Sequence, residues 1–112
     1  MRETKATHCM VYVTAASKEE ALRIGRTLVT ERLAACANVL PGMQSVYWWQ
    51  GAVDEAEEAV LILKTRKELA GRAVARIKAI HSYEVPCAVV YDIADALPAY
   101  LHWIDVSTSQ VS

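Results

Sequence analysis

Three side chains of metal-binding type lie within seven residues of one another in the segment HSYEVPC: His81, Glu84 and Cys87. An imidazole, a carboxylate and a thiol are donor types that transition metals use, and a thiol suits Cu(I) or Zn(II) in particular. One imidazole alone holds copper(II) weakly, because a copper(II) site needs several donors. A histidine at a helix end also has a structural interpretation, since its charged form is favoured at the negative end of the helix dipole. Both interpretations of His81 stay open.

The three cysteines, Cys9, Cys36 and Cys87, are odd in number and show no C-x-x-C spacing. This pattern disfavours a disulfide framework and a zinc knuckle, so we expect three reduced thiols. An isolated cysteine in an apolar run is also typical of a small buried hydrophobe. The four glycines form no phosphate-binding loop, and the first turn, TAASKEE, has no glycine and no arginine to bind an anion. The residues therefore do not predict an enzyme.

The chain has 112 residues with 12 basic and 13 acidic side chains. This size predicts one domain over residues 1–112, with a core over about 8–107. Basic residues are interspersed with acidic ones, so we expect no nucleic-acid partner. The first eight residues lack the apolar core of a secretory signal, and no apolar run approaches the roughly 20 residues that span a bilayer. We therefore expect no membrane partner and a cytoplasmic location.

Hydrophobic periodicity and turn residues predict four strands and three helices. Ser17 and Glu20 form a capping box at the start of the first helix. Pro41-Gly42 must lie at a bulge, a bend or an unpaired edge, because proline has no N–H for the ladder. The expected elements are a strand His8–Thr14, a helix from Lys18 to near Leu33 or Ala34, a strand from 34 to Gln50 interrupted at Pro41-Gly42, a loop from Gly51 through VDEAEE, a strand Glu58–Thr65, a helix Lys67–His81, a strand Cys87–Ile93 and a short helix from Pro98.

This order predicts an α+β, ferredoxin-like βαββαβ fold with a C-terminal helix. The four strands would form an antiparallel sheet with both long helices on one face, and a hairpin would join the second and third strands. The other face and two edges would stay bare. An edge that carries Tyr47, Trp48 and Trp49 would promote aggregation unless another chain covers it. We therefore expect these three aromatics to contact a neighbouring subunit.

Four motifs, LAACANVLPG, SVYWWQG, EEAVLILKT and YEVPC, follow one another over about His8–Ser107. Together they resemble the CutA1 family of divalent-cation tolerance proteins. The resemblance implies a homotrimer of ferredoxin-like subunits, related in architecture to the PII signalling proteins, in which the long hairpin with Trp48 and Trp49 exchanges between neighbours. It also implies a link to copper and divalent-metal tolerance, with no established reaction.

The resemblance extends to individual positions. His81 matches a histidine of the family segment H-P-Y-E-V-P that has been proposed as a copper ligand, whereas Ile80 and Val13 stand where some members have a second histidine and a cysteine. Gln50 and Cys87 stand where the family usually has glutamates. These departures remove two hard oxygen donors and add a soft thiol, which leaves His81, Glu84 and Cys87 as the candidate metal ligands.

The resemblance further implies a ligand cleft between subunits, lined by Trp49, Glu58, Lys64, Tyr83 and Glu84. Glu58 and Lys64 are six residues apart on one strand face, roughly 20 Å, so they cannot pair with each other. Such a cluster fits either a pocket for a small ligand or an interfacial salt-bridge network. The leading hypothesis is a metal-responsive trimer that binds copper or another divalent ion. The alternatives are a PII-like small-ligand sensor or scaffold and a purely structural module.

Overall fold

The computed structural model describes residues 5–109, so residues 1–4 and 110–112 of the predicted domain lie outside the described residues. The sheet has the strand order β2-β3-β1-β4, and each neighbouring pair is antiparallel. This order confirms the ferredoxin-like α+β prediction. The elements are β1 (His8–Ala15), α1 (Lys18–Thr30), β2 (Cys36–Trp49), β3 (Ala52–Arg66), a 3-10 turn (Lys67–Leu69), α2 (Ala70–Ile80), β4 (Ala88–Asp92) and α3 (Pro98–Ser107).

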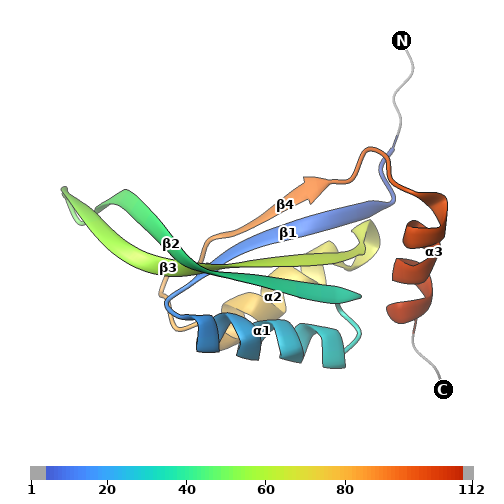
Figure 1. The fold of residues 1–112 in the computed structure, drawn as a ribbon, viewed down its shortest axis with the longest axis horizontal. Coiled ribbons are helices and arrows are strands. Elements are labelled where there is room, and N and C mark those ends of the chain that lie inside the picture. Colours follow the sequence, from blue (N-terminus) through green and yellow to red (C-terminus); the bar gives the residue numbers. More distant parts are fainter. Residues whose placement is uncertain (1–4, 110–112) are drawn as a thin grey trace, which may run out of the picture.

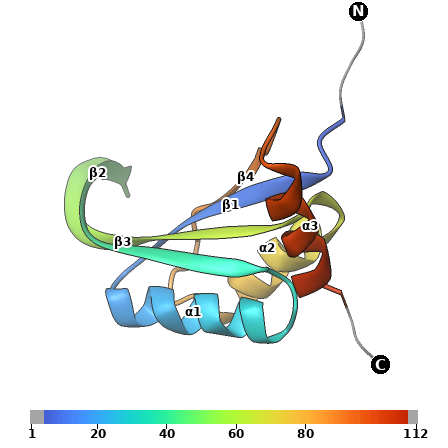
Figure 2. The ribbon, with the colours of Figure 1, turned by 45° about the vertical axis from the view of Figure 1, so that its right-hand side comes forward.

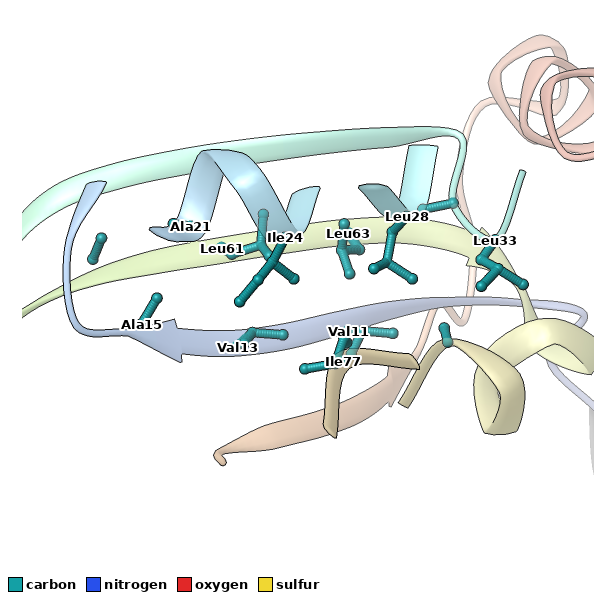
Figure 3. Close-up of a cluster of buried hydrophobic side chains, with 13 residues drawn as sticks. Val11, Val13, Ala15, Ala21, Ile24, Leu28, Leu33, Leu61, Leu63 and Ile77 are labelled. Atoms are coloured by element: carbon teal, nitrogen blue, oxygen red, sulfur yellow. The ribbon is translucent and has the colours of Figure 1, made fainter. Parts of the chain in front are cut away.

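The core lies between the sheet and the two helices α1 and α2, which cover the same face (Figure 1). Strand β3 alternates as its sequence predicts, and its helix-facing residues from Ala59 to Thr65 are at most 1% exposed. Burying these side chains is the main favourable contribution to folding, at roughly 25 cal/mol per Å² of apolar surface. Figure 3 shows the cluster, in which side chains of α1 and α2 point toward the sheet; the labelled members are Val11, Val13, Ala15, Ala21, Ile24, Leu28, Leu33, Leu61, Leu63 and Ile77.

Helix α1 begins as its capping motif predicts and ends earlier than expected. The Ser17 hydroxyl accepts the Glu20 N–H at 3.1 Å. The helix stops at Thr30 instead of continuing to Leu33 or Ala34, because Arg32 adopts a left-handed conformation with φ 62°. The Leu33 N–H then reaches back to the carbonyl of Leu28 at 2.9 Å, and the Arg32 N–H to that of Val29 at 3.0 Å. These two bonds form a Schellman motif, which satisfies the last helical carbonyls.

Strands β2 and β3 form a long hairpin, as the resemblance implied. Pro41-Gly42 lies at an irregularity in the pairing between Leu40 and Met43, as predicted for a proline inside a strand. The expected loop after Gly51 is wrong: Trp49 pairs directly with Ala52, so VDEAEE belongs to β3. Gln50 and Gly51 form a two-residue turn with φ 50° and 83°. Two positive φ values are typical of a type I′ turn, whose twist matches that of the flanking strands and continues the ladder.

The outer half of this hairpin, residues 43–58, is called here the hairpin arm. It extends past the ends of α1 and α2 (Figure 1) and curls away from the sheet (Figure 2). Its large apolar side chains lie largely in solvent: Trp48 is 75% exposed, Val46 68% and Val53 57%. A two-stranded hairpin is marginally stable by itself in water, so packing against another surface is the expected way to order it.

Helix α3 packs at the end of the sheet distant from the hairpin arm (Figure 1). Pro98 lies in its first turn as predicted, and Ile104 is fully buried. The imidazole Nε2 of His8 lies 2.8 Å from the Asp105 carboxylate, and the Arg66 guanidinium donates to Thr108 at 2.9 Å. Among the described residues, the sheet face opposite α1 and α2 stays largely exposed, with Leu40 58% and Tyr91 51% exposed on it. Within residues 5–109, no helix is long and apolar enough to cross a membrane.

Candidate functional site

The candidate site is a cleft of about 610 Å³ between the hairpin arm and the connector from α2 to β4. The bulge at Pro41-Gly42 bends β2, and the arm then forms one wall of the cleft. Central strand β1 contributes the floor, and the connector closes the opposite side. The aromatic side chains that line the cleft are Tyr12, Tyr47, Trp49 and Tyr83, and the carboxylates are Asp54, Glu58 and Glu84.

Glu58 and Tyr83 form the central polar contact of the cleft. The Tyr83 hydroxyl donates to Glu58 Oε2 at 2.7 Å, which joins the connector to β3. Glu58 is only 9% exposed. Burial, together with the hydrogen bond to the Glu58 carboxylate, raises the pKa of Tyr83 well above its ordinary value.

His81 positions the connector that carries Tyr83. Its Nε2 donates to the Thr14 carbonyl at 2.7 Å, and its Nδ1 accepts the Tyr83 N–H at 3.0 Å. The side chain is fully buried, and its ring centre lies 4.6 Å from that of Tyr83. Both ring nitrogens are therefore engaged with the backbone, which requires the neutral tautomer protonated at Nε2. This arrangement supports the structural interpretation of His81 and leaves no ring nitrogen free for a metal ion.

Glu20 fixes the same connector from the side of α1. Its carboxylate accepts the N–H of Ala16 at 3.0 Å and that of Ser82 at 2.8 Å, and the residue is 8% exposed. Burial by itself would raise the pKa of Glu20, but the N–H groups of Ala16 and Ser82 outweigh it and hold the pKa below its ordinary value of 4.5. The sequence identified Glu20 as a capping residue and missed this second role, because Ser82 is distant in the chain.

The three predicted metal ligands do not converge. Glu84 and Cys87 line the cleft, whereas His81 is buried behind the connector. Residues 5–109 contain no group of three or more histidine, cysteine, aspartate or glutamate side chains that could hold a metal ion. All three cysteines are free, as predicted, and Cys87 is half-buried. The described residues of one chain thus supply too few converging donors for a copper or zinc site, and the metal ligands stay a prediction.

The other predicted cleft residues divide into two groups. Trp49, Glu58, Tyr83 and Glu84 lie together around the cleft of the single chain. Lys64 lies farther along β3, where its ammonium donates to Asn38 at 2.8 Å and approaches the Cys36 sulfur at 4.0 Å. The sequence missed Tyr12 and Asp54 as lining residues. Tyr12 had a usable signal, since it alternates with helix-facing residues on the central strand and must face the opposite side.

Fold and cleft together define a ferredoxin-like α+β domain with a protruding hairpin and an acidic, aromatic cleft beside it. The family model described as CutA1 divalent ion tolerance protein matches residues 9–107. This chain belongs to that family.

Several relatives support the family assignment. The divalent-cation tolerance protein CutA of Archaeoglobus fulgidus is 42% identical over 98 residues, which cover 88% of this chain and 95% of the relative. The crystal structure of CutA from Xylella fastidiosa is similar with a TM-score of 0.90 and 36% identity, over 93% of this chain and 100% of that one. The rice protein CutA 1 is 39% identical over 96% of this chain, which spans only 60% of the rice protein's length. The Archaeoglobus and Xylella names describe no reaction.

The expectation of a cytoplasmic location is wrong. The rice relative is named chloroplastic, and the Archaeoglobus structure, with a TM-score of 0.88 and 40% identity over 91% of this chain and 99% of that one, is named periplasmic. The prediction used the lack of a secretory signal in the first eight residues and the lack of an apolar run long enough to span a bilayer. Neither feature is tied to one compartment, because the same core and sheet fold in any aqueous environment.

Proposed function

We propose that this protein acts in divalent-cation tolerance as a homotrimer, in a binding role and not as a catalyst. The observation that carries the proposal is the hairpin arm, whose Trp48 is 75% exposed in the single chain. An exposed strand pair with large apolar side chains marks a contact surface. The exposed face of the sheet also supports a contact between copies, since Leu40 and Tyr91 on this face are 58% and 51% exposed. The number of copies, three, follows from the family resemblance.

Metal ligation in this proposal depends on Glu84 and Cys87, which line the same cleft. His81 contributes indirectly by holding the connector between them and α2. A carboxylate and a thiolate provide two donors, so further donors must come from an adjoining copy or from water. The thiol favours copper(I) or zinc over harder ions such as magnesium.

Native mass spectrometry tests assembly and metal binding in one experiment. The protein at micromolar subunit concentration is examined with and without one equivalent of copper or zinc, in the presence of a weak competing chelator. We expect a trimer that retains metal in a fixed ratio and loses it in the Cys87→Ser variant. Cys36→Ser is the matched control, because Cys36 is the first residue of β2, at the end of that strand distant from the hairpin arm, and does not line the cleft. A single chain would disprove the trimer, and equal metal retention by both variants would disprove the Cys87 ligand.

A further inference from the structure

The charge of the cleft has one sign. Three of its lining side chains, Asp54, Glu58 and Glu84, are carboxylates, and within the described part of the chain no lysine, arginine or histidine lines it. A lysine and carboxylates in one pocket would suit a zwitterion or an organic anion, but Lys64 lies elsewhere on β3 and is bonded to Asn38. A cleft with only acidic charged groups repels anions and concentrates cations.

The negative charge of Glu58 costs free energy when no positive group lies beside it, because the side chain is nearly buried. It is 9% exposed, and its carboxylate accepts the neutral hydroxyl of Tyr83 at 2.7 Å. Among residues 5–109, no basic side chain forms an ion pair with it. A nearly buried carboxylate is stable as an anion only when it is well hydrogen-bonded or paired with a positive charge. The second oxygen of Glu58 is thus the natural partner of a positive group inside the cleft.

The walls of the cleft indicate what kind of positive group fits. Four aromatic side chains, Tyr12, Tyr47, Trp49 and Tyr83, line it. Aromatic faces attract ammonium and guanidinium groups through their quadrupole, most strongly where water is excluded. A bare metal ion gains little from aromatic faces, so these walls favour an organic cation beside Glu58. The cleft volume of about 610 Å³ lies in the range of pockets that take whole small molecules.

We infer that this cleft binds a small organic cation, whose ammonium or guanidinium group lies against Glu58 between the aromatic walls. The inference goes beyond divalent-cation tolerance and does not depend on it, because it uses Glu58 and the aromatic faces instead of the Cys87 thiol. A lysine or arginine of a neighbouring copy has the same head group. The cleft volume favours a free molecule over one such side chain, and the experiment separates the two sources.

Isothermal titration calorimetry of the metal-free, assembled full chain in EDTA tests the inference. The probes are choline, agmatine and putrescine, together with 3,3-dimethylbutan-1-ol as the neutral isostere of choline and succinate as an anion. We expect at least one cation to bind at one molecule per subunit with a Kd below about 1 mM. If choline is that cation, the neutral isostere binds about tenfold more weakly or worse; succinate does not bind in any case.

Two glutamate variants identify the carboxylate. Glu58→Gln keeps an oxygen that can accept the Tyr83 hydroxyl and removes the charge, so we expect affinity for the cation to fall about tenfold or more. Glu57→Gln removes the same charge from the next residue of β3, which is exposed and does not line the cleft, and should change affinity less than about twofold. Cys87→Ser should keep cation binding even where it abolishes metal retention, so the two proposals fail separately.

Three results would overturn the inference. The first is that no cation binds the assembled protein, which includes the case in which a neighbouring copy's side chain fills the cleft and the probes bind only dissociated subunits. The second is that 3,3-dimethylbutan-1-ol binds as tightly as choline, since the site would then recognise shape and not charge. The third is equal affinity in the Glu58→Gln and Glu57→Gln variants.

Discussion

Replacing Gly25 with alanine tests how closely α1 packs on the sheet. A Cβ atom at Gly25 would lie 2.8 Å from the Cβ of Ala37 on β2 and 3.1 Å from Cδ1 of Leu61 on β3. Leu61 can shift its methyl group by rotation, but the Ala37 Cβ is fixed to the strand backbone. The helix or the strand must therefore move, and such overpacking costs about 1–3 kcal/mol.

The same substitution also has a favourable effect on helix propensity. Replacing a second helical glycine, Gly71, measures that effect without the clash. Alanine is a better helix former than glycine by up to about 1 kcal/mol. A Cβ atom added at Gly71 in α2 would have nothing within 4 Å, so Gly71→Ala should show only this gain. We expect Gly71→Ala to raise the free energy of unfolding by about 0.5–1 kcal/mol and Gly25→Ala to lower it by about 1–2 kcal/mol.

Urea unfolding of the wild type and the two variants at one subunit concentration measures both values. The double variant Gly25→Ala with Ala37→Gly removes the clashing methyl group, so it should recover part of the loss despite a glycine in the strand. A Gly25→Ala variant as stable as Gly71→Ala would refute the close contact between α1 and β2.

Three further predictions concern the connector, the assembly and the turn. Glu20→Gln should lower the free energy of unfolding by about 1–2 kcal/mol at pH 7. Because the folded pKa of Glu20 is depressed, this deficit should shrink as the pH falls below about 4.5 in a pH series of urea titrations. Trp48→Ala should weaken self-association by about 3–5 kcal/mol per subunit in sedimentation equilibrium, since Trp48 is 75% exposed in one chain; unchanged association would contradict the contact surface. Gly51→Ala forces a side chain into φ 83° and should lower the free energy of unfolding by about 1–2 kcal/mol; an unchanged value would contradict the left-handed conformation of Gly51.

The elements that the sequence predicted well depend on short-range patterns. Strand β3 shows a period of two, which directly separates Leu61 and Leu63 from Ile62 on the opposite face. Ser17 accepts the N–H three residues later, and Pro98 needs no hydrogen bond at its own nitrogen. Each pattern is local, so each can be interpreted without knowing the rest of the chain.

The two misplaced boundaries had misleading local signals. Helix α1 ends with Arg32 in the left-handed region, where glycine is the usual residue, so no stop signal is visible in the sequence. The Arg32 guanidinium donates to the Ser107 carbonyl at 2.9 Å, a tertiary contact that favours this conformation. In β3, Asp54 and Glu55 have low strand propensity, but pairing with β2 through the tight turn overrides it.

The candidate site was predictable in its members more than in their roles. Glu58, Tyr83 and Glu84 do lie around one cleft of the single chain. The role of His81 could not be obtained from its position in the sequence. A histidine at a helix end can have a ring nitrogen free to bind a metal ion, or it can have both ring nitrogens hydrogen-bonded to the protein. Only the Thr14 carbonyl on β1 and the Tyr83 N–H decide between them, and the first of these lies 67 residues away in the chain.

The hairpin arm would couple the proposed assembly to the proposed cation binding. Tyr47 and Trp49 line the cleft from the arm, while Trp48 between them points to a different surface. Any neighbour that holds Trp48 therefore also restrains the two aromatic walls. If assembly already restrains these side chains, the protein loses less conformational entropy when the cation binds, so assembly should raise cation affinity. By thermodynamic reciprocity, the bound cation should strengthen assembly by the same free energy. Trp48→Ala, which removes no cleft atom, should then weaken both.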